Sequence, residues 1–103
     1  MGMMGKVQEL QAKMQSLQDE LAETTVSGQA GGGMVTATLT LKGELREVRV
    51  DPSLLVADER EILEDLVVAA HADAKSKADR LAQEKTAELT AGLPLPPGMK
   101  MPF

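Results

Sequence analysis

The 103-residue sequence contains no cysteine, tryptophan or tyrosine, and its single phenylalanine is Phe103. Without cysteine the chain has neither a disulfide framework nor a thiolate metal site. With so few aromatic residues, we expect a core of Leu, Val, Met and Ala and almost no platform on which nucleobases would stack. No apolar run approaches the roughly 20 residues that span a bilayer, and the first residues are amphipathic rather than a signal peptide. The sequence therefore predicts a cytoplasmic protein that does not enter a membrane.

Size and charge narrow the class further. A chain of 103 residues is expected to form one domain that buries only roughly 60 to 70% of its unfolded surface, which favours oligomerisation. The formal net charge is −5, which argues against a generally basic surface. Any site for a polyanion must therefore be local.

The first helix expected from the sequence spans residues 3–23 and carries a heptad seam, that is, an apolar stripe with alternating spacings of three and four. Met3 extends this seam upstream by four residues. No second heptad helix lies next to it in the sequence, so either the far end of the chain or another copy must cover much of the stripe. We therefore expect a homodimer. The seam consists of Val7, Leu10, Met14, Leu17 and Leu21.

The remaining elements predict an α+β fold: a helix, a three-stranded antiparallel sheet over residues 26–50, and a long helix over residues 58–91. These elements form one domain over residues 1–92, followed by a proline-rich tail over residues 93–103. Together with the seam, five further residues are expected in the core or the dimer contact: Leu39, Leu41, Val48, Val50 and Leu66.

Local patterns define the strand faces and the helix start. The three glycines 31–33 are expected to form a turn, and the strand that follows alternates between a buried face and a wet face that includes Thr40. Asp58 and Glu61 have the spacing of a capping box, so the long helix is expected to begin near Asp58. Its alanines would allow a neighbouring element to approach closely.

The search for chemistry in the sequence finds no catalytic or metal site. His71 has no second histidine to share a metal and no convincing nucleophile, so a structural or solvent-facing role is expected. The glycines 31–33 lack the lysine of a P-loop and precede a strand, and the acidic residues 58–65 have no calcium-loop spacing. The sequence thus predicts a protein without cofactor, metal or enzymatic activity.

Basic residues remain as a clue to a partner. They lie on both predicted helices, and the second half of the long helix has a slightly positive balance. Cations in a row contact phosphates, and two copies would double the footprint, although an ordinary solvated helix face explains the same pattern. The candidate residues for double-stranded DNA are Lys6, Lys13, Lys75, Lys77, Arg80 and Lys85.

Several motifs occur in an order that resembles the YbaB/EbfC family of bacterial nucleoid-associated proteins. The helix, the glycine-containing segment 26–35 and the long helix all match, and the resemblance covers nearly the whole chain. The most specific matches are the runs Asp51, Pro52, Ser53, Leu54, Leu55; Leu63, Glu64, Asp65, Leu66, Val67, Ala69; and Gly92, Leu95, Pro96, Pro97, Gly98, Lys100, Pro102, Phe103.

This resemblance implies a homodimer that is joined through the sheet region, projects its helices as arms and binds duplex DNA with low sequence specificity. Such a protein would organise the chromosome or modulate gene expression in the nucleoid. The chain departs from the family pattern at Ala72, where the family often has an asparagine before the aspartate Asp73. A protein-interaction adaptor for a recombination or replication factor remains the alternative, since the net charge of −5 is compatible with it.

Overall fold

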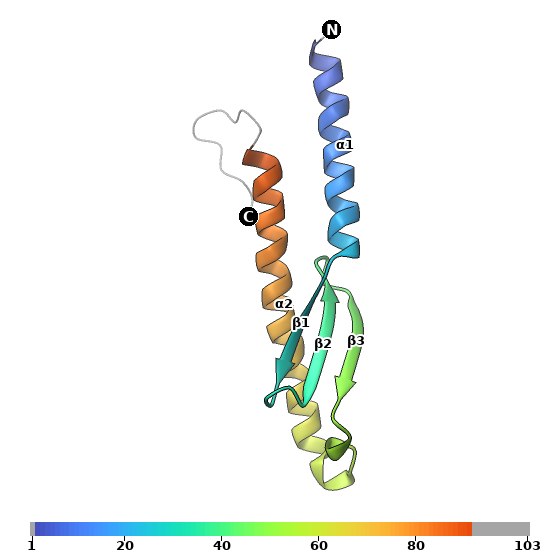
Figure 1. The fold of residues 1–103 in the computed structure, drawn as a ribbon, viewed down its shortest axis with the longest axis vertical. Helices are drawn as coiled ribbons and strands as arrows, with labels where there is room; N and C mark the ends of the chain where they lie inside the picture. Colours follow the sequence, from blue (N-terminus) through green and yellow to red (C-terminus); the bar gives the residue numbers. More distant parts are fainter. Residues whose placement is uncertain (1, 92–103) are drawn as a thin grey trace.

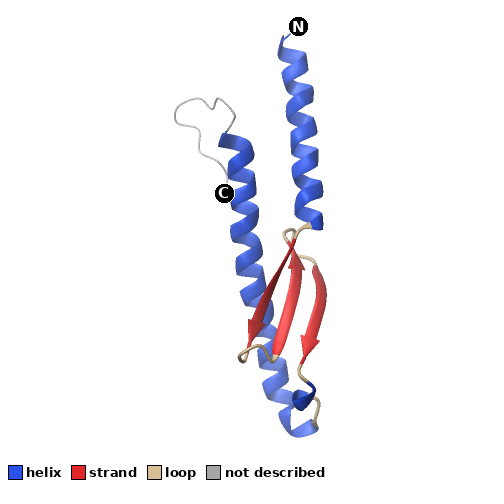
Figure 2. Cartoon of the chain, viewed as in Figure 1, coloured by secondary structure: helices blue, strands red, loops and turns tan. Residues whose placement is uncertain are grey.

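A computed structural model describes residues 2–91, and these form an α+β fold of the predicted order (Figure 2). The predicted tail 93–103 lies outside the described residues, so the division after Gly92 stays a prediction. The elements are α1 (Gly2–Glu23), β1 (Thr25–Ala30), β2 (Val35–Thr40), β3 (Leu45–Val50), the 3₁₀ turns η1 (Pro52–Leu54) and η2 (Ala57–Glu59), and α2 (Arg60–Ala91).

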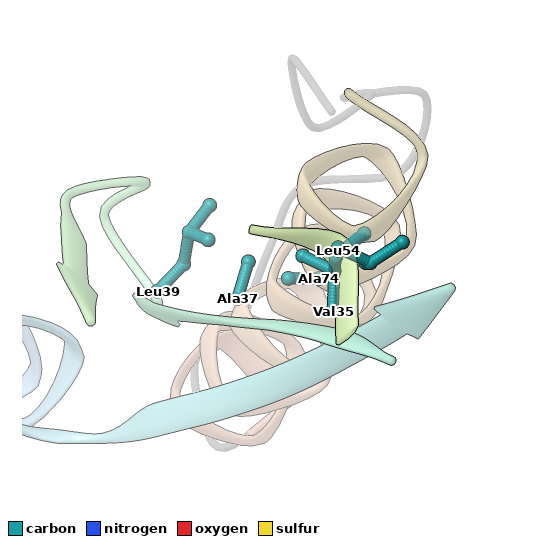
Figure 3. Close-up of a cluster of buried hydrophobic side chains, with 6 residues drawn as sticks. Val35, Ala37, Leu39, Leu54 and Ala74 are labelled. Carbon is teal, nitrogen blue, oxygen red and sulfur yellow. The ribbon is translucent and has the colours of Figure 1, made fainter. Parts of the chain in front are cut away.

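The sheet is antiparallel, with the strand order β1-β2-β3, and α2 crosses one of its faces. α1 rises from the end of the sheet beside the second half of α2 (Figure 1). The main core lies between α2 and the sheet, where apolar side chains of β2 meet small residues of α2 (Figure 3). Its buried members are Val35, Ala37, Leu39, Leu54, Ala70 and Ala74.

The alanines of α2 allow this helix to lie directly against β1. Ala70, Ala74 and Ala78 are fully buried and recur every four residues, so they share one face of the helix. Opposite them, a Cβ atom added to Gly28 would lie 2.1 Å from the backbone nitrogen of Ala74 and 2.6 Å from the carbonyl oxygen of Ala70. Only glycine fits at that point of β1. The predicted close approach is confirmed, with Gly28 as its strand partner.

The α1 seam is covered along only half of its length. Leu17 and Leu21 are buried against Leu41 and Ala78, so the same chain, one of the two covers that the sequence left open, packs on this part of the seam. In contrast, Val7 is 54% exposed and Met14 is 44% exposed. Leu10 is half-buried. The seam therefore has a packed lower half and an upper half without a full covering.

The turn before β2 forms at the predicted glycines, whereas the predicted exposure of Thr40 is wrong. Gly31, Gly32 and Gly33 have φ of 64°, 67° and 95°, which is the left-handed region that the predicted turn needs. Thr40, however, is wholly buried rather than wet. Its Oγ1 accepts hydrogen bonds from the backbone N–H groups of Lys42 at 3.2 Å and Glu44 at 3.1 Å. The hydroxyl thus replaces water as the partner of the turn that leads into β3.

The segment before α2 corrects the predicted helix start. Asp51 accepts a hydrogen bond from the backbone N–H of Ser53 at 2.9 Å and so caps the short turn η1. The capping box of Asp58 and Glu61 does not form among the described residues, because Asp58 belongs to η2 and α2 begins only at Arg60. A 3₁₀ turn therefore takes the place of the side-chain cap.

β3 is the most exposed strand, and this changes the prediction for Val48. Leu39 pairs with Leu45, and Thr38 pairs with Glu47, so Arg46 is the extra residue of a β-bulge. The bulge places Leu45 and Val48 on the face that α2 covers elsewhere. α2 lies over β1 and β2, so Leu45 is 52% exposed and Val48 is 38% exposed. Val48 is therefore not in the core of the single chain, and its predicted place in a dimer contact stays a prediction. Val50 and Leu66, which were predicted in the same set, pack at the edge of the core.

Candidate nucleic-acid interface

The predicted cations of α2 lie on opposite flanks of the helix. Lys75 lies beside Gly43, in the turn between β2 and β3. Lys77 reaches β1, at the other edge of the sheet. The two lysines are also paired within the chain, Lys75 with Asp79 at 2.5 Å and Lys77 with Asp73 at 3.0 Å. The structure therefore does not gather the basic residues of α2 on a single face.

Lys77 and Asp73 together close the outer edge of β1. Asp73 accepts a hydrogen bond from the backbone N–H of Gln29 at 3.0 Å, and Lys77 donates one to the carbonyl oxygen of Ser27 at 3.2 Å. The bond from Gln29, assisted by Lys77, holds the pKa of Asp73 below its ordinary value. These bonds occupy the positions that a further strand would use, so β1 is protected against strand addition.

Lys13 and Lys85 line a hollow of about 430 Å³ between α1 and α2. Lys85 donates a hydrogen bond of 2.5 Å to Glu20, and this contact raises the pKa of Lys85. Lys13 forms an ion pair of 3.4 Å with Glu9. Glu88 also lines the hollow, so its charged lining comprises three carboxylates and two ammonium groups. The hollow itself is therefore not a phosphate pocket.

Arg80 differs from the other candidates because its guanidinium has no hydrogen bond or ion pair with the part of the chain that the structure describes. It is exposed on α2. Sequence reasoning missed Lys42, which is likewise exposed and whose ammonium group has no partner within residues 2–91. The signal for Lys42 was its position in a tight turn, where its side chain has few neighbours. The side chain of Lys6 lies outside the described part.

Negative charge gathers at the end of the molecule remote from the free end of α1. Segment 51–65 contains six carboxylates and one arginine, a balance that equals the net charge of the whole chain. This segment comprises η1, η2 and the first turns of α2, at the bottom of Figure 1. The remainder of the chain is formally neutral. The acidic end therefore repels a polyanion more strongly than the remainder of the molecule does.

A second surface feature is an apolar groove of about 240 Å³ between β3 and α2. Leu45 and Val48 line it from the strand side, and Val68, which is 70% exposed, lines it from α2. His71 borders the groove and is exposed, as expected for a histidine without a partner site. Across residues 2–91, no group bonds to the outer edge of β3. An open strand edge beside uncovered apolar side chains is typical of an association surface.

Among the described side chains, no group of three or more His, Asp or Glu residues is placed to hold a metal ion. None of the helices in the described part is long and apolar enough to cross a membrane. The surfaces that the described residues present are exposed cations on α2 and in the turn before β3, and an apolar groove between β3 and α2.

Comparison with known proteins identifies the class of protein. Residues 1–93 match the YbaB/EbfC DNA-binding family. Nucleoid-associated protein Atu0095 of Agrobacterium fabrum is 63% identical over the whole chain and 96% of its own length. Nucleoid-associated protein R00231 of Rhizobium meliloti is 60% identical with the same coverage, and a nucleoid-associated protein of Brucella ovis is 57% identical.

The chain therefore belongs to the YbaB/EbfC DNA-binding family, and the predicted membership is confirmed. The fold is also found in the crystal structure of the uncharacterized protein HP0035 from Helicobacter pylori, with a TM-score of 0.71 over 85% of this chain and 91% of that chain. At 23% identity this likeness concerns the fold alone. The family is one of DNA-binding proteins rather than a known enzyme class, and the matches give no support to the adaptor alternative.

Proposed function

We propose that this protein binds double-stranded DNA as a homodimer with low sequence specificity, and that it organises the chromosome or modulates gene expression in the nucleoid. Membership of a DNA-binding family is the observation that carries the proposal. The names of the bacterial relatives support the nucleoid as its location. The segregation of charge supports a defined orientation, in which the acidic segment 51–65 lies away from the duplex.

Phosphate contacts in this proposal come from the arms formed by α1 and α2. Arg80 makes the primary contact, because its guanidinium is exposed and has no carboxylate partner within residues 2–91. Lys13, Lys75 and Lys77 are paired but have side chains that are 57%, 47% and 45% exposed. Exposed pairs contribute only about 0 to 1 kcal/mol, so a phosphate can replace the carboxylate. Lys6 and Lys85 complete the proposed set, although the Lys85 side chain is only 22% exposed.

Low sequence specificity follows from the same geometry. Lysine and arginine contacts to phosphates hold a protein on a duplex without reading bases, which are read in the grooves. The arms carry no aromatic side chain for stacking, since Phe103 is the only Phe, Trp or Tyr in the chain. We therefore infer that the protein recognises the duplex as a polyanion rather than a particular sequence.

The dimer of this proposal forms through the apolar groove and the open edge of β3. Leu45, Val48 and Val68 are exposed there, and a two-fold axis would place the same groove of the partner against them. The outer edge of β1 is closed by Asp73 and Lys77, so β3 is the edge that remains available. Joined in this way, two copies direct two pairs of helical arms toward the DNA.

The dependence of DNA affinity on salt is the first test. Fluorescence anisotropy with two labelled duplexes of unrelated sequence is measured between about 50 and 200 mM salt. We expect affinity to fall steeply with salt and to be nearly equal for the two duplexes, because each phosphate neutralised releases counterions. An affinity that does not change across this range contradicts phosphate binding, and a large difference between the duplexes contradicts low specificity.

Charge reversal at Arg80 locates the contact surface. Arg80→Glu is expected to weaken binding and to reduce the salt slope by about one for each lost contact. Arg60→Glu is the matched control, since it makes the same charge change on the same helix but within the acidic end. Equal losses in both variants would mean that only net charge matters. Unchanged binding by a folded Arg80→Glu dimer would place the contact surface elsewhere.

Light scattering tests the dimer independently of DNA. The parent chain is expected to have the mass of a dimer at micromolar concentration, and Val68→Asp is expected to shift it toward the monomer by placing a charge in the groove. Ala69→Asp is the control, because Ala69 is also exposed on α2 but does not line the groove. A monomeric parent chain would contradict the proposal, and equal effects of the two variants would place the interface elsewhere.

A further inference from the structure

Within residues 2–91, the upper half of the α1 seam lacks a partner because α2 ends below it. Lys85 and Glu20 are in contact. The two helices are antiparallel, so the chain direction of α1 is opposite to that of α2 (Figure 1). α2 ends at Ala91, six residues beyond Lys85, which corresponds to a rise of about 9 Å. An equal rise along α1 leads from Glu20 to Met14. The first half of α1 therefore extends past the end of α2, as Figure 1 shows.

The seam residues at and above this level are those that stay exposed. Met14 is 44% exposed and Val7 is 54% exposed, while Leu17, one turn below Met14, is buried. Leu10 lies between Val7 and Met14 and is half-buried. The stripe is thus continuous with the packed seam and loses its cover where the described part of the chain ends.

Segment 92–103 follows Ala91 in the sequence. Its sequence GLPLPPGMKMPF places large apolar residues at positions 93, 95, 99, 101 and 103, with Pro, Gly or Lys between most of them. In an extended chain, alternate positions share one side. Proline fixes φ near −65° and donates no backbone hydrogen bond, so such a segment loses little conformational freedom and needs no strand partner when it binds to a surface.

We propose that segment 92–103 folds back along α1 of the same chain and covers Val7, Leu10 and Met14 with its alternate apolar residues. Twelve residues at about 3.3 Å each, the rise of an extended chain with alternating sides, span about 40 Å, whereas Met14 and Val7 are about 10 Å apart along the helix. The reach is therefore ample. Covalent attachment also gives the segment an effective concentration of about millimolar at the seam, which exceeds that of a second copy at micromolar concentration.

Several features of the chain make the inference directly measurable. The sequence has no tryptophan or tyrosine, so Phe103→Trp introduces a single fluorophore at the end of the segment. We expect its emission in the folded chain to be blue-shifted, and protected from acrylamide quenching, relative to the same chain unfolded in urea. A second reporter, Met101→Trp, is expected to behave in the same way, whereas Lys100→Trp lies at an intervening position and is expected to be quenched freely.

Seam variants test whether α1 is the surface that protects the reporter. Val7→Glu with Met14→Glu is expected to abolish the blue shift of the Phe103→Trp reporter. Gln8→Glu with Ala12→Glu is the matched control, since it adds the same charge at exposed positions away from the stripe. Circular dichroism verifies that both variants remain folded. The proposal is overturned if the folded and unfolded chains give the same emission, or if the two double variants change it equally.

Mixing separates a segment bound to its own chain from one bound to another copy. The Phe103→Trp chain that carries Val7→Glu and Met14→Glu is mixed with an excess of the parent chain, whose seam is intact. The proposal requires that the reporter remains exposed in this mixture and that the blue shift of the intact reporter chain survives dilution. Recovery of the blue shift on mixing, or its loss on dilution, would assign the segment to the seam of a second copy and overturn the proposal.

Discussion

Gly28 is the position where a single methyl group is expected to damage the fold most. The Cβ atom of Gly28→Ala would lie 2.1 Å from the backbone nitrogen of Ala74, against about 3.4 Å for an ordinary contact. The obstacle is the backbone of α2, which has no side-chain rotamer that could relieve the clash. β1 must therefore move away from α2 by about 1.3 Å. This movement would also lengthen the hydrogen bond between Gln29 and Asp73.

The magnitude follows from this displacement. Overpacking of a close-packed site generally costs about 1 to 3 kcal/mol, and we expect Gly28→Ala at or above the upper end because backbone must shift. Urea unfolding followed by circular dichroism, at one protein concentration for all variants, measures the loss. Gly5→Ala is the control: its Cβ meets nothing within 4 Å. The same substitution in that helix should stabilise by up to about 1 kcal/mol. A Gly28→Ala variant within about 0.5 kcal/mol of the parent refutes the close packing.

Three further predictions concern stability. Leu17→Ala removes a buried seam residue and is expected to cost about 2 to 5 kcal/mol in urea unfolding, whereas Met14→Ala should change stability by less than about 0.5 kcal/mol; equal effects would contradict the division of the seam. Thr40→Val leaves two turn N–H groups without their acceptor and should cost about 1 to 3 kcal/mol, while Thr40→Ser retains the hydroxyl and most of the stability. Asp73 has a lowered folded-state pKa, so its contribution is present above its ordinary value of 3.8 and is lost as the pH falls through the folded value. Asp73→Asn should therefore reduce the acid sensitivity of the urea midpoint, and an unchanged sensitivity would contradict the role of the Gln29–Asp73 bond. Part of the sensitivity remains because the hydrogen bond from Ser53 also lowers the pKa of Asp51.

Periodicity predicted the elements because each period has a direct physical cause. The alternation along β2 placed Val35, Ala37, Leu39 and Leu41 on the buried face, and all four are buried. Alternation failed where the chain departs from a regular ladder. At β3, the extra residue Arg46 resets the alternation, so Leu45 was not recognised as part of the same face as Val48. The sequence of one strand does not show how much of the sheet a helix will cover. That coverage decides whether apolar residues such as Leu45 and Val48 lie in the core or on the surface.

The candidate site was less predictable because it depends on pairings across the fold. The position of Lys77 on an apparently solvated face gave no sign that Ser27 and Asp73 would hold it, since these partners belong to different elements. Likewise, Lys85 and Glu20 are 65 residues apart in the sequence but form one contact. Counting cations along a helix therefore overestimates the charge that is free for a ligand. Arg80 was predicted from the sequence, but the absence of a partner for Arg80 and for Lys42 within residues 2–91 emerged only once the contacts of all described cations were known.

A net charge of −5 is compatible with DNA binding when the charge is placed as it is in this fold. The Debye length is about 8 Å at physiological ionic strength, so carboxylates several times farther away have little effect on an arm. α2 rises about 30 Å from Asp65 to Lys85, which separates the acidic end from the far cations by several screening lengths. The acidic segment then acts on orientation, because it repels a duplex more strongly than α1 and the second half of α2 do. Adding a carboxylate to the second half of α2 should therefore weaken DNA binding far more than adding a carboxylate beside Arg60.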